Sequence, residues 1–522
     1  MNILIRAAWR MLGLGLLALA SLGAQAAQVV TNHGAVEGVD QGGVRAFLGI
    51  PYAQPPVGPL RWRAPQDLPA WPGVRATQAF APACMQDTPR AWGPFTDEYV
   101  QLRAPISEDC LYLNVWTPQN AAAGSLPVLV WIHGGGFGSG AASVPIYDGA
   151  SLAARGAVVV SINYRLGLLG FLSHPALAAE SPQSVSGNYG LLDMVAALRW
   201  VQANIARFGG RADQVTIAGQ SAGAAAVVDL LAMPSARGLF QRAIAMSGAG
   251  MGARPLTLAE AQRQGEQLLN QAGIGSLAEL RQRPAESLLS LKPAMDFSGG
   301  MPRLLLAPVV DGQVLPVDPE TTAAALASPV PLVSGYMADE GFVMGPPPST
   351  PASFEAHVRQ RYGAAADGFL AAYPHADDAQ ATASMRQIGR DRYMASLLLW
   401  AERRARLGQT VYGYVYERPI PGPDAARFGA FHTGEVPYLF GVFEHRPYTA
   451  EDRAVSVLLQ THWLGFAAGR GLPAPWTAIT DRASPVTRLG QPVPVSGEAL
   501  SSPQRLRLFA DFVAAGGVLT MF

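Results

Sequence analysis

The chain has 522 residues, of which 49% are hydrophobic and 15% are charged. This composition is typical of a globular enzyme whose strands are covered by helices, and it excludes large-scale disorder. Lys and Arg together number 38, as do Asp and Glu, so the formal net charge is zero. No global field would therefore attract nucleic acid or an anionic membrane, and we expect a small-molecule substrate that is selected by a pocket.

The first residues have the pattern of a signal peptide. Arg6 and Arg10 precede an apolar run over residues 11–20, and small residues follow around Ala24. The run is well short of the ~20 apolar residues that a bilayer span requires, so we expect cleavage and no membrane anchor. Residues 1–26 are excluded from the fold, and the mature protein is expected to be secreted or periplasmic.

Two cysteines occur in the whole chain, Cys84 and Cys110. In an exported protein such a pair is more often a disulfide than two free thiols.

Strands and helices alternate through the first half of the chain. Continuous apolar runs over residues 127–132 and 157–162 are typical of buried parallel strands. Apolar residues that recur every three or four positions predict an amphipathic helix over residues 190–208. A strand over 214–219 and an alanine-rich helix over 222–231 follow. This order predicts an α/β fold with a mostly parallel sheet.

The second half continues the sheet and interrupts it with helices. We expect further strands over residues 242–246, 331–334 and 411–416. The stretches 256–291 and 353–408 are rich in Ala, Gln, Glu and Arg, and both are predicted to be helical insertions over the sheet.

The pattern Gly-Gln-Ser-Ala-Gly over residues 219–223 matches the nucleophile elbow of serine hydrolases. Such a pattern can occur by chance in a glycine-rich chain, but here it lies between a predicted strand and a predicted helix, as an elbow must. The helix begins directly after Ser221, and its N-terminal amides favour negative charge there. We therefore expect Ser221 to be the nucleophile.

A second glycine-rich segment precedes the elbow. Residues 133–136 read His-Gly-Gly-Gly and follow the strand that ends at residue 132. Consecutive glycines allow backbone N–H groups to converge on one oxygen, which a tetrahedral intermediate requires. We assign an oxyanion hole to the N–H groups of Gly135, Gly136 and Ala222, as in esterases that carry such a run before the elbow.

A serine nucleophile requires a base, and the chain offers eight histidines. The chain order serine, acid, histidine excludes two that precede the elbow, and a third belongs to the oxyanion loop. Of the rest, His432 is favoured, because it lies in a glycine-containing loop after a predicted strand. The other candidates lack such a setting: His357, His375, His445 and His462.

The acid must lie between Ser221 and His432, shortly after a strand. Asp339 and Glu340 are the best placed pair, and spacing does not decide between them. Asp311 is a weaker candidate in a predicted turn.

Several long motifs together resemble the type-B carboxylesterases, a family that includes the cholinesterases. They occur in the family's order and cover most of the chain, at residues 47–62, 107–116, 163–167, 187–193 and around His432. The resemblance implies a single α/β-hydrolase domain over residues 27–522 with a large central sheet. We expect no cofactor.

The same resemblance implies roles for individual residues. It favours Glu340 over Asp339 as the acid, agrees with His432 as the base, and pairs Cys84 with Cys110. It also implies that Ser247 is a hydroxyl close to the triad.

The elbow departs from the family pattern at two positions. Gln220 replaces the usual glutamate, and Ala224 replaces a common glycine. Without a carboxylate beside the nucleophile, we expect neutral or anionic esters rather than choline-type esters as substrates. The family also contains adhesion proteins without a triad, which leaves a non-catalytic binding module as one alternative; a carbamate or amide hydrolase and a lipase are others. No His, Cys, Asp and Glu cluster has metal-ligand spacing, so no metal is expected.

Overall fold

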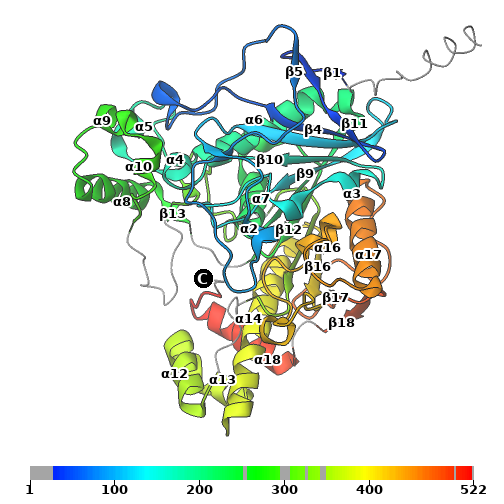
Figure 1. The fold of residues 1–522 in the computed structure, drawn as a ribbon. Coiled ribbons are helices and arrows are strands. Elements are labelled where there is room, and N and C mark those ends of the chain that lie inside the picture. The colour runs from blue at the N-terminus through cyan, green and yellow to red at the C-terminus, as the bar shows by residue number, and fades with distance from the viewer. Residues whose placement is uncertain are drawn as a thin grey trace, which may run out of the picture.

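The computed structural model describes residues 28–250, 255–293, 306–323, 327–340, 349–498 and 501–519. The predicted signal peptide over residues 1–26 lies outside these ranges. An eleven-stranded mixed sheet forms the centre, with helices on both faces (Figure 1). In chain order its strands are β3 (Val39–Gln41), β4 (Val44–Pro51), β8 (Tyr112–Pro118), β9 (Leu126–Ile132), β10 (Val158–Ile162), β11 (Gly210–Gln220), β12 (Arg242–Met246), β15 (Leu332–Met337), β16 (Val411–Tyr416), β17 (Val486–Leu489) and β18 (Val495–Gly497).

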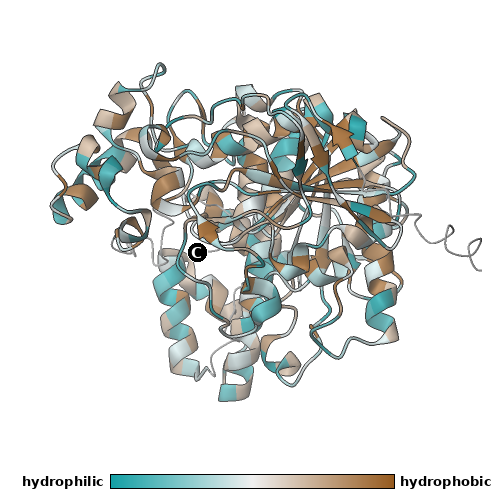
Figure 2. Ribbon diagram, turned by 45° about the horizontal axis from the view of Figure 1, so that its top comes forward, coloured by the Kyte–Doolittle hydropathy of each residue, from teal (hydrophilic) through white to brown (hydrophobic). Residues whose placement is uncertain are grey.

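The centre of the sheet is parallel and its edges are antiparallel. Across the sheet the order is β18-β17-β16-β15-β12-β11-β9-β10-β8-β4-β3. All neighbours from β17 to β10 are parallel, whereas β18, β8, β4 and β3 pair antiparallel. Every residue of β10 and β15 is buried, and the central strands are the most hydrophobic part of the ribbon (Figure 2). Burial on both faces explains the continuous apolar runs, and the predicted α/β fold class is confirmed.

The two helices that the sequence predicts beside the sheet, over residues 190–208 and 222–231, are both present, with one difference; α3 (Ala150–Ala153) and α17 (Ala450–Ala467), which also pack on the sheet, were not predicted. The predicted helix over residues 190–208 ends as an α-helix at Asn204 and continues as a 3₁₀ turn over Ile205–Phe208. Gly209, at φ 92°, ends it in the left-handed region. The helices outside the two insertions are α2 (Asp97–Val100), α3 (Ala150–Ala153), α4 (Gly167–Phe171), α5 (Pro175–Ala179), α6 (Tyr189–Asn204), α7 (Ala222–Ala232), α15 (Ala425–Phe428), α16 (Val436–Phe440) and α17 (Ala450–Ala467).

Both predicted insertions are helical. In Figure 1 the first forms a group at the left edge of the molecule, and α12 and α13 of the second project away from the sheet. The long helix α14 packs on β15 and β16, and the C-terminal helix α18 packs on α14. The insertion helices and the C-terminal helix are α8 (Leu258–Gln271), α9 (Leu277–Gln282), α10 (Ala285–Leu288), α12 (Pro351–Tyr362), α13 (Ala366–Ala372), α14 (Asp378–Arg406) and α18 (Pro503–Ala514).

Smaller elements complete the N-terminal part. Cys84 and Cys110 form a disulfide across 26 positions of sequence. None of the helices in the described part of the chain combines the length and apolar character needed to cross a bilayer. The small sheets consist of β1 (Gln28–Val30), β2 (Ala35–Glu37) and β5 (Val74–Ala76), of β6 (Ala83–Cys84) and β7 (Ile106–Ser107), and of β13 (Leu256–Thr257) and β14 (Val309–Val310).

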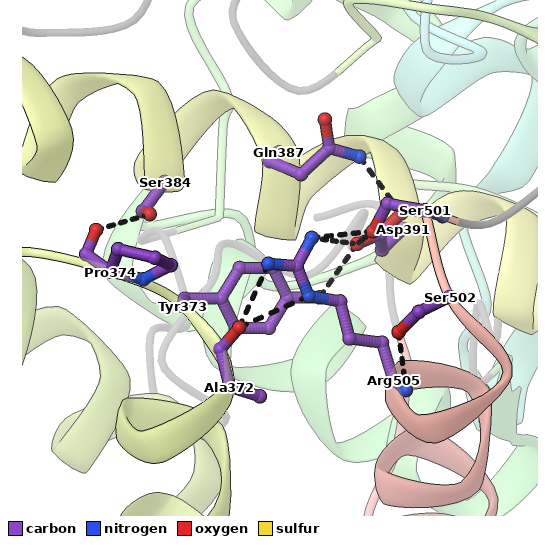
Figure 3. Close-up of polar contacts among 9 residues, drawn as sticks. All are labelled: Ala372, Tyr373, Pro374, Ser384, Gln387, Asp391, Ser501, Ser502 and Arg505. Carbon is purple, nitrogen blue, oxygen red and sulfur yellow. Dashed lines mark hydrogen bonds and ion pairs between the residues drawn. The ribbon is translucent and has the colours of Figure 1, made fainter.

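A buried polar network attaches α18 to the rest of the molecule (Figure 3). Its centre is Asp391 on α14, whose carboxylate accepts hydrogen bonds from the Tyr373 hydroxyl at 2.8 Å and the Gln387 amide at 2.9 Å. The backbone N–H and hydroxyl of Ser501 also donate to it, at 3.1 and 2.6 Å. Arg505 lies 3.5 Å from the same carboxylate and 4.0 Å above the Tyr373 ring. One buried carboxylate therefore joins three segments of the chain.

Candidate active site

Ser221 lies in the tight turn between β11 and α7, as the strand-turn-helix pattern predicts. Its backbone has φ 58° and ψ −125°, a sparsely populated conformation that costs about 1–3 kcal/mol for a residue with a side chain. The turn closes tightly, because a Cβ on Gly219 would lie 2.4 Å from the carbonyl oxygen of Gly223. The Ser221 N–H donates to the Met246 oxygen at 2.9 Å, which ties the turn to the end of β12.

His432 and Glu340 meet above the same edge of the sheet. The imidazole Nδ1 lies 2.5 Å from Glu340 Oε2, and both side chains are buried. The second oxygen of Glu340 accepts from the Met337 N–H at 2.8 Å and from the Ser247 hydroxyl. The carboxylate is thus fixed by the end of β15 and the end of β12. Of the two acidic candidates, Glu340 is the one that contacts the imidazole.

Gln220 contacts the other nitrogen of the same imidazole. Its Nε2 lies 3.1 Å from His432 Nε2, and the side chain is 2% exposed. A carboxylate at Nδ1 favours the proton there, so Nε2 accepts and the Gln220 amide donates. Within the described residues the Ser221 hydroxyl has no hydrogen-bond partner. Such catalytic contacts often form only when substrate is bound.

The glycine loop after β9 leaves two N–H groups available. Within the described residues neither Gly135 nor Gly136 donates a hydrogen bond to the protein. The N–H of Ala222 is the first of α7 and has no acceptor inside the helix. All three therefore remain free for an external oxygen.

His133 anchors this loop rather than acting as a base. Its Nδ1 lies 2.8 Å from the Gly134 oxygen, and its ring stacks on Tyr164 with centroids 4.5 Å apart. The Tyr164 hydroxyl donates to the His133 carbonyl at 2.8 Å. Burial lowers the pKa of His133 to about 4, so the ring is neutral at physiological pH.

Several other candidates lie in structural contacts. Asp311 accepts from the Asn188 amide at 2.9 Å and from the backbone of its own turn. His462 accepts from the Trp476 indole at 3.1 Å. Burial, together with the nearby charges of two arginines, lowers the pKa of His357 to about 4. His375 lies 3.5 Å from Glu355.

Sequence reasoning missed a further buried acid near the site. Glu435 accepts a hydrogen bond from the Tyr414 hydroxyl at 2.8 Å, and its other oxygen has no partner among the described residues. Burial and the nearby Glu340 carboxylate raise the pKa of Glu435 to about 8, despite the bond from Tyr414. The feature of the sequence that could have identified Glu435 is its position three residues after His432.

In the described part of the chain, no group of three or more His, Cys, Asp or Glu side chains is arranged to hold a metal ion.

An elbow on a mostly parallel sheet, a glycine loop beside it and a buried imidazole–carboxylate pair are features of the α/β-hydrolase fold. A sequence profile described as the carboxylesterase family matches residues 25–503, and the chain belongs to that family.

Named relatives agree with this assignment. The chain is 38% identical to the fumonisin B1 esterase of Sphingopyxis macrogoltabida, over 91% of this chain and 88% of the relative. It is 36% identical to the para-nitrobenzyl esterase of Bacillus subtilis, over 84% and 89%. Over 58% of this chain and 56% of the relative, it is 41% identical to a cocaine esterase of Oryctolagus cuniculus. The protein is therefore an ester hydrolase, as predicted.

Proposed function

We propose that the protein hydrolyses carboxylic esters through an acyl-enzyme, with Ser221 as nucleophile, His432 as general base and Glu340 as the acid that orients it. Ser221 attacks the carbonyl carbon as its proton passes to His432 Nε2. The N–H groups of Gly135, Gly136 and Ala222 stabilise the oxyanion. His432 returns the proton to the leaving alcohol, and water then repeats the sequence on the acyl-enzyme.

The observation that carries this proposal is the 2.5 Å contact between His432 Nδ1 and Glu340 Oε2. A buried carboxylate on Nδ1 keeps the proton there and leaves Nε2 as the basic nitrogen. The strained backbone of Ser221 supports the nucleophile assignment, since such strain is typical of functional turns.

Covalent labelling tests the nucleophile directly. A fluorophosphonate should modify Ser221 stoichiometrically, as seen by peptide mass spectrometry, and should abolish esterase activity in parallel. Ser221→Ala should not be labelled. A non-catalytic binding module would not react, so an unmodified Ser221 in folded protein would contradict the proposal.

For the substrate, we propose neutral or anionic esters rather than choline-type esters, because Gln220 puts a neutral amide where a carboxylate would attract a cation. A panel of p-nitrophenyl esters of increasing acyl length, with matched carbamates and anilides, defines the preferred class. A lipase would instead show activation at a lipid–water interface. Carbamate or anilide turnover above that of the ester would move the assignment to that class.

We also propose that the protein works outside the cytoplasm. The Cys84–Cys110 disulfide is favoured in oxidising compartments, and the pattern over residues 1–26 is that of a cleaved leader. Intact mass of the protein from periplasmic and culture fractions tests this. Activity confined to the cytoplasm, with the leader retained, would contradict it.

A further inference from the structure

The segment that carries the proposed acid and the segment that carries the proposed base run side by side. The Asp339 N–H donates to the Ala430 oxygen at 2.9 Å, and the Ala430 N–H donates to Asp339 Oδ2 at 3.0 Å. A parallel bridge pairs Asp339 with Phe431. The next residue on each segment is Glu340 and His432. The register of this short ladder therefore puts the carboxylate opposite the imidazole.

The Asp339 carboxylate fits tightly against the second segment. Gly429 has φ +62°, and a Cβ at this position would lie 2.1 Å from Asp339 Oδ2. The Asp339 side chain is only 3% exposed. One carboxylate oxygen is therefore committed to the backbone that leads to His432.

The other oxygen of Asp339 faces helix α14. Arg390 donates to Oδ1 from Nε at 3.1 Å and from Nη2 at 2.8 Å. Arg386, one turn earlier, lies 3.6 Å from the same oxygen and donates to the Arg427 carbonyl at 3.4 Å. Two guanidinium groups thus pair with the buried carboxylate and tie both segments to helix α14.

We propose that Asp339 is a positioning residue for the esterase reaction: its carboxylate fixes the register of the 429–432 segment, so that His432 stays aligned with Glu340. It touches neither the imidazole nor the reacting atoms. The inference rests on the proposed roles of His432 and Glu340, and it adds a role for Asp339, Arg386 and Arg390 that the triad does not include.

Substitution of Asp339 tests the proposal, with a buried carboxylate on α14 as a matched control. Asp339→Ala should lower kcat by about 10- to 100-fold and leave KM within about threefold, because a misplacement of about 1 Å affects the transition state more than substrate binding. Asp339→Asn keeps an acceptor for the Ala430 N–H and should lose less, about three- to tenfold.

The control is Glu402, another buried carboxylate with two arginine partners. It lies on α14, 2.7 Å from Arg482 and 3.1 Å from Arg406. Glu402→Ala should lower the melting temperature about as much as Asp339→Ala, and kcat should stay within about twofold. Equal kcat losses in both variants would show a general effect of stability and overturn the proposal.

A double-substitution cycle separates this inference from the triad assignment. In the Glu340→Gln background, Asp339→Ala should lower kcat by less than about threefold, because the register matters only while the imidazole has its carboxylate. A full loss in that background, or an unchanged kcat in Asp339→Ala alone, would overturn the proposal. Near-normal activity of Glu340→Gln would instead refute the triad. If Asp339→Ala does not fold, Asp339→Asn and Arg390→Met replace it in the comparisons with Glu402→Ala and with the Glu340→Gln background.

Discussion

Two buried carboxylates, Glu340 after strand β15 and Asp391 in the helical insertion, are equally buried but differ in what they contact. Each is 1% exposed. Apart from Gln387 on its own helix, the partners of Asp391 join α14 to other segments (Figure 3). The partners of Glu340 include the His432 imidazole, whose other nitrogen, Nε2, is not bound to the carboxylate. A buried acid supports chemistry when one of its partners can still exchange a proton.

The two regions are joined by adjacent residues of α14. Arg390 contacts Asp339, next to the proposed acid, whereas Asp391 contacts Arg505 on α18. Substitutions on either side of this junction should therefore separate effects on rate from effects on stability.

The largest effect is expected at the nucleophile. Ser221→Ala should lower kcat by roughly three or more orders of magnitude and leave folding intact, since only oxyanion stabilisation and binding remain. Steady-state kinetics and circular dichroism measure the two quantities. A variant with near-full activity would contradict the assignment of Ser221.

The second largest effect separates the two neighbouring acids. Glu340→Gln should lower kcat by about two to four orders of magnitude, because the amide no longer fixes the imidazole tautomer. Asp339→Asn should cost far less. The reverse order would move the role of acid to Asp339.

The sequence predicted the parts of the molecule that depend on local pattern. Strands with buried apolar runs, such as β9 and β10, were revealed by the length and continuity of those runs. The edge strand β18 and its neighbour β17 were missed, because they have only three and four residues and neither is a continuous apolar run. Their formation depends on pairing with a sheet that is already present.

The candidate site likewise combines a local motif, which the sequence predicted, with contacts between distant residues, which it did not. The elbow could be predicted because its turn requires specific residues in consecutive positions. The Asp339–Ala430 ladder and the contact between Gln220 and His432 join residues 91 and 212 positions apart, and only the fold brings them together. Without the family resemblance, spacing alone left Asp339 and Glu340 equivalent.

In the helical insertion, Asp391→Ala should lower the free energy of unfolding by about 3–5 kcal/mol, because it leaves Arg505 and the buried Tyr373 hydroxyl without their shared acceptor. The kcat at 25 °C should stay within about twofold. Urea denaturation and steady-state kinetics on the same samples test this. A large loss of kcat with little loss of stability would remove the contrast with Glu340.

The pKa of Glu435, raised to about 8 by burial, predicts a pH-dependent cost to stability. The folded state keeps a proton that the unfolded chain releases above about pH 4.5, so this group lowers stability as pH rises from 4.5 towards 8. Relative to the wild type, Glu435→Gln should gain about 1–3 kcal/mol between pH 5 and pH 8.5. Urea denaturation at both pH values measures the change. Glu286→Gln, at an exposed position, should show no such trend, and an equal trend in both variants would contradict the prediction.

The smallest effect is expected at Gln220. Its amide lies 3.1 Å from His432 Nε2, so a carboxylate there would attract a cationic alcohol group and favour the protonated imidazole, and a neutral amide does neither. The wild type should hydrolyse a butyl-type ester better than its isosteric choline analogue. Gln220→Glu should shift the ratio of kcat/KM towards the cation by about 1–2 kcal/mol, an effect that salt weakens. The same variant should move the acidic limb of the pH–rate profile to higher pH, whereas Gln220→Met, which is neutral, should leave the substrate ratio unchanged. A wild type that prefers the choline ester, or a ratio that Gln220→Glu does not change at low salt, would show that this position does not set the charge preference.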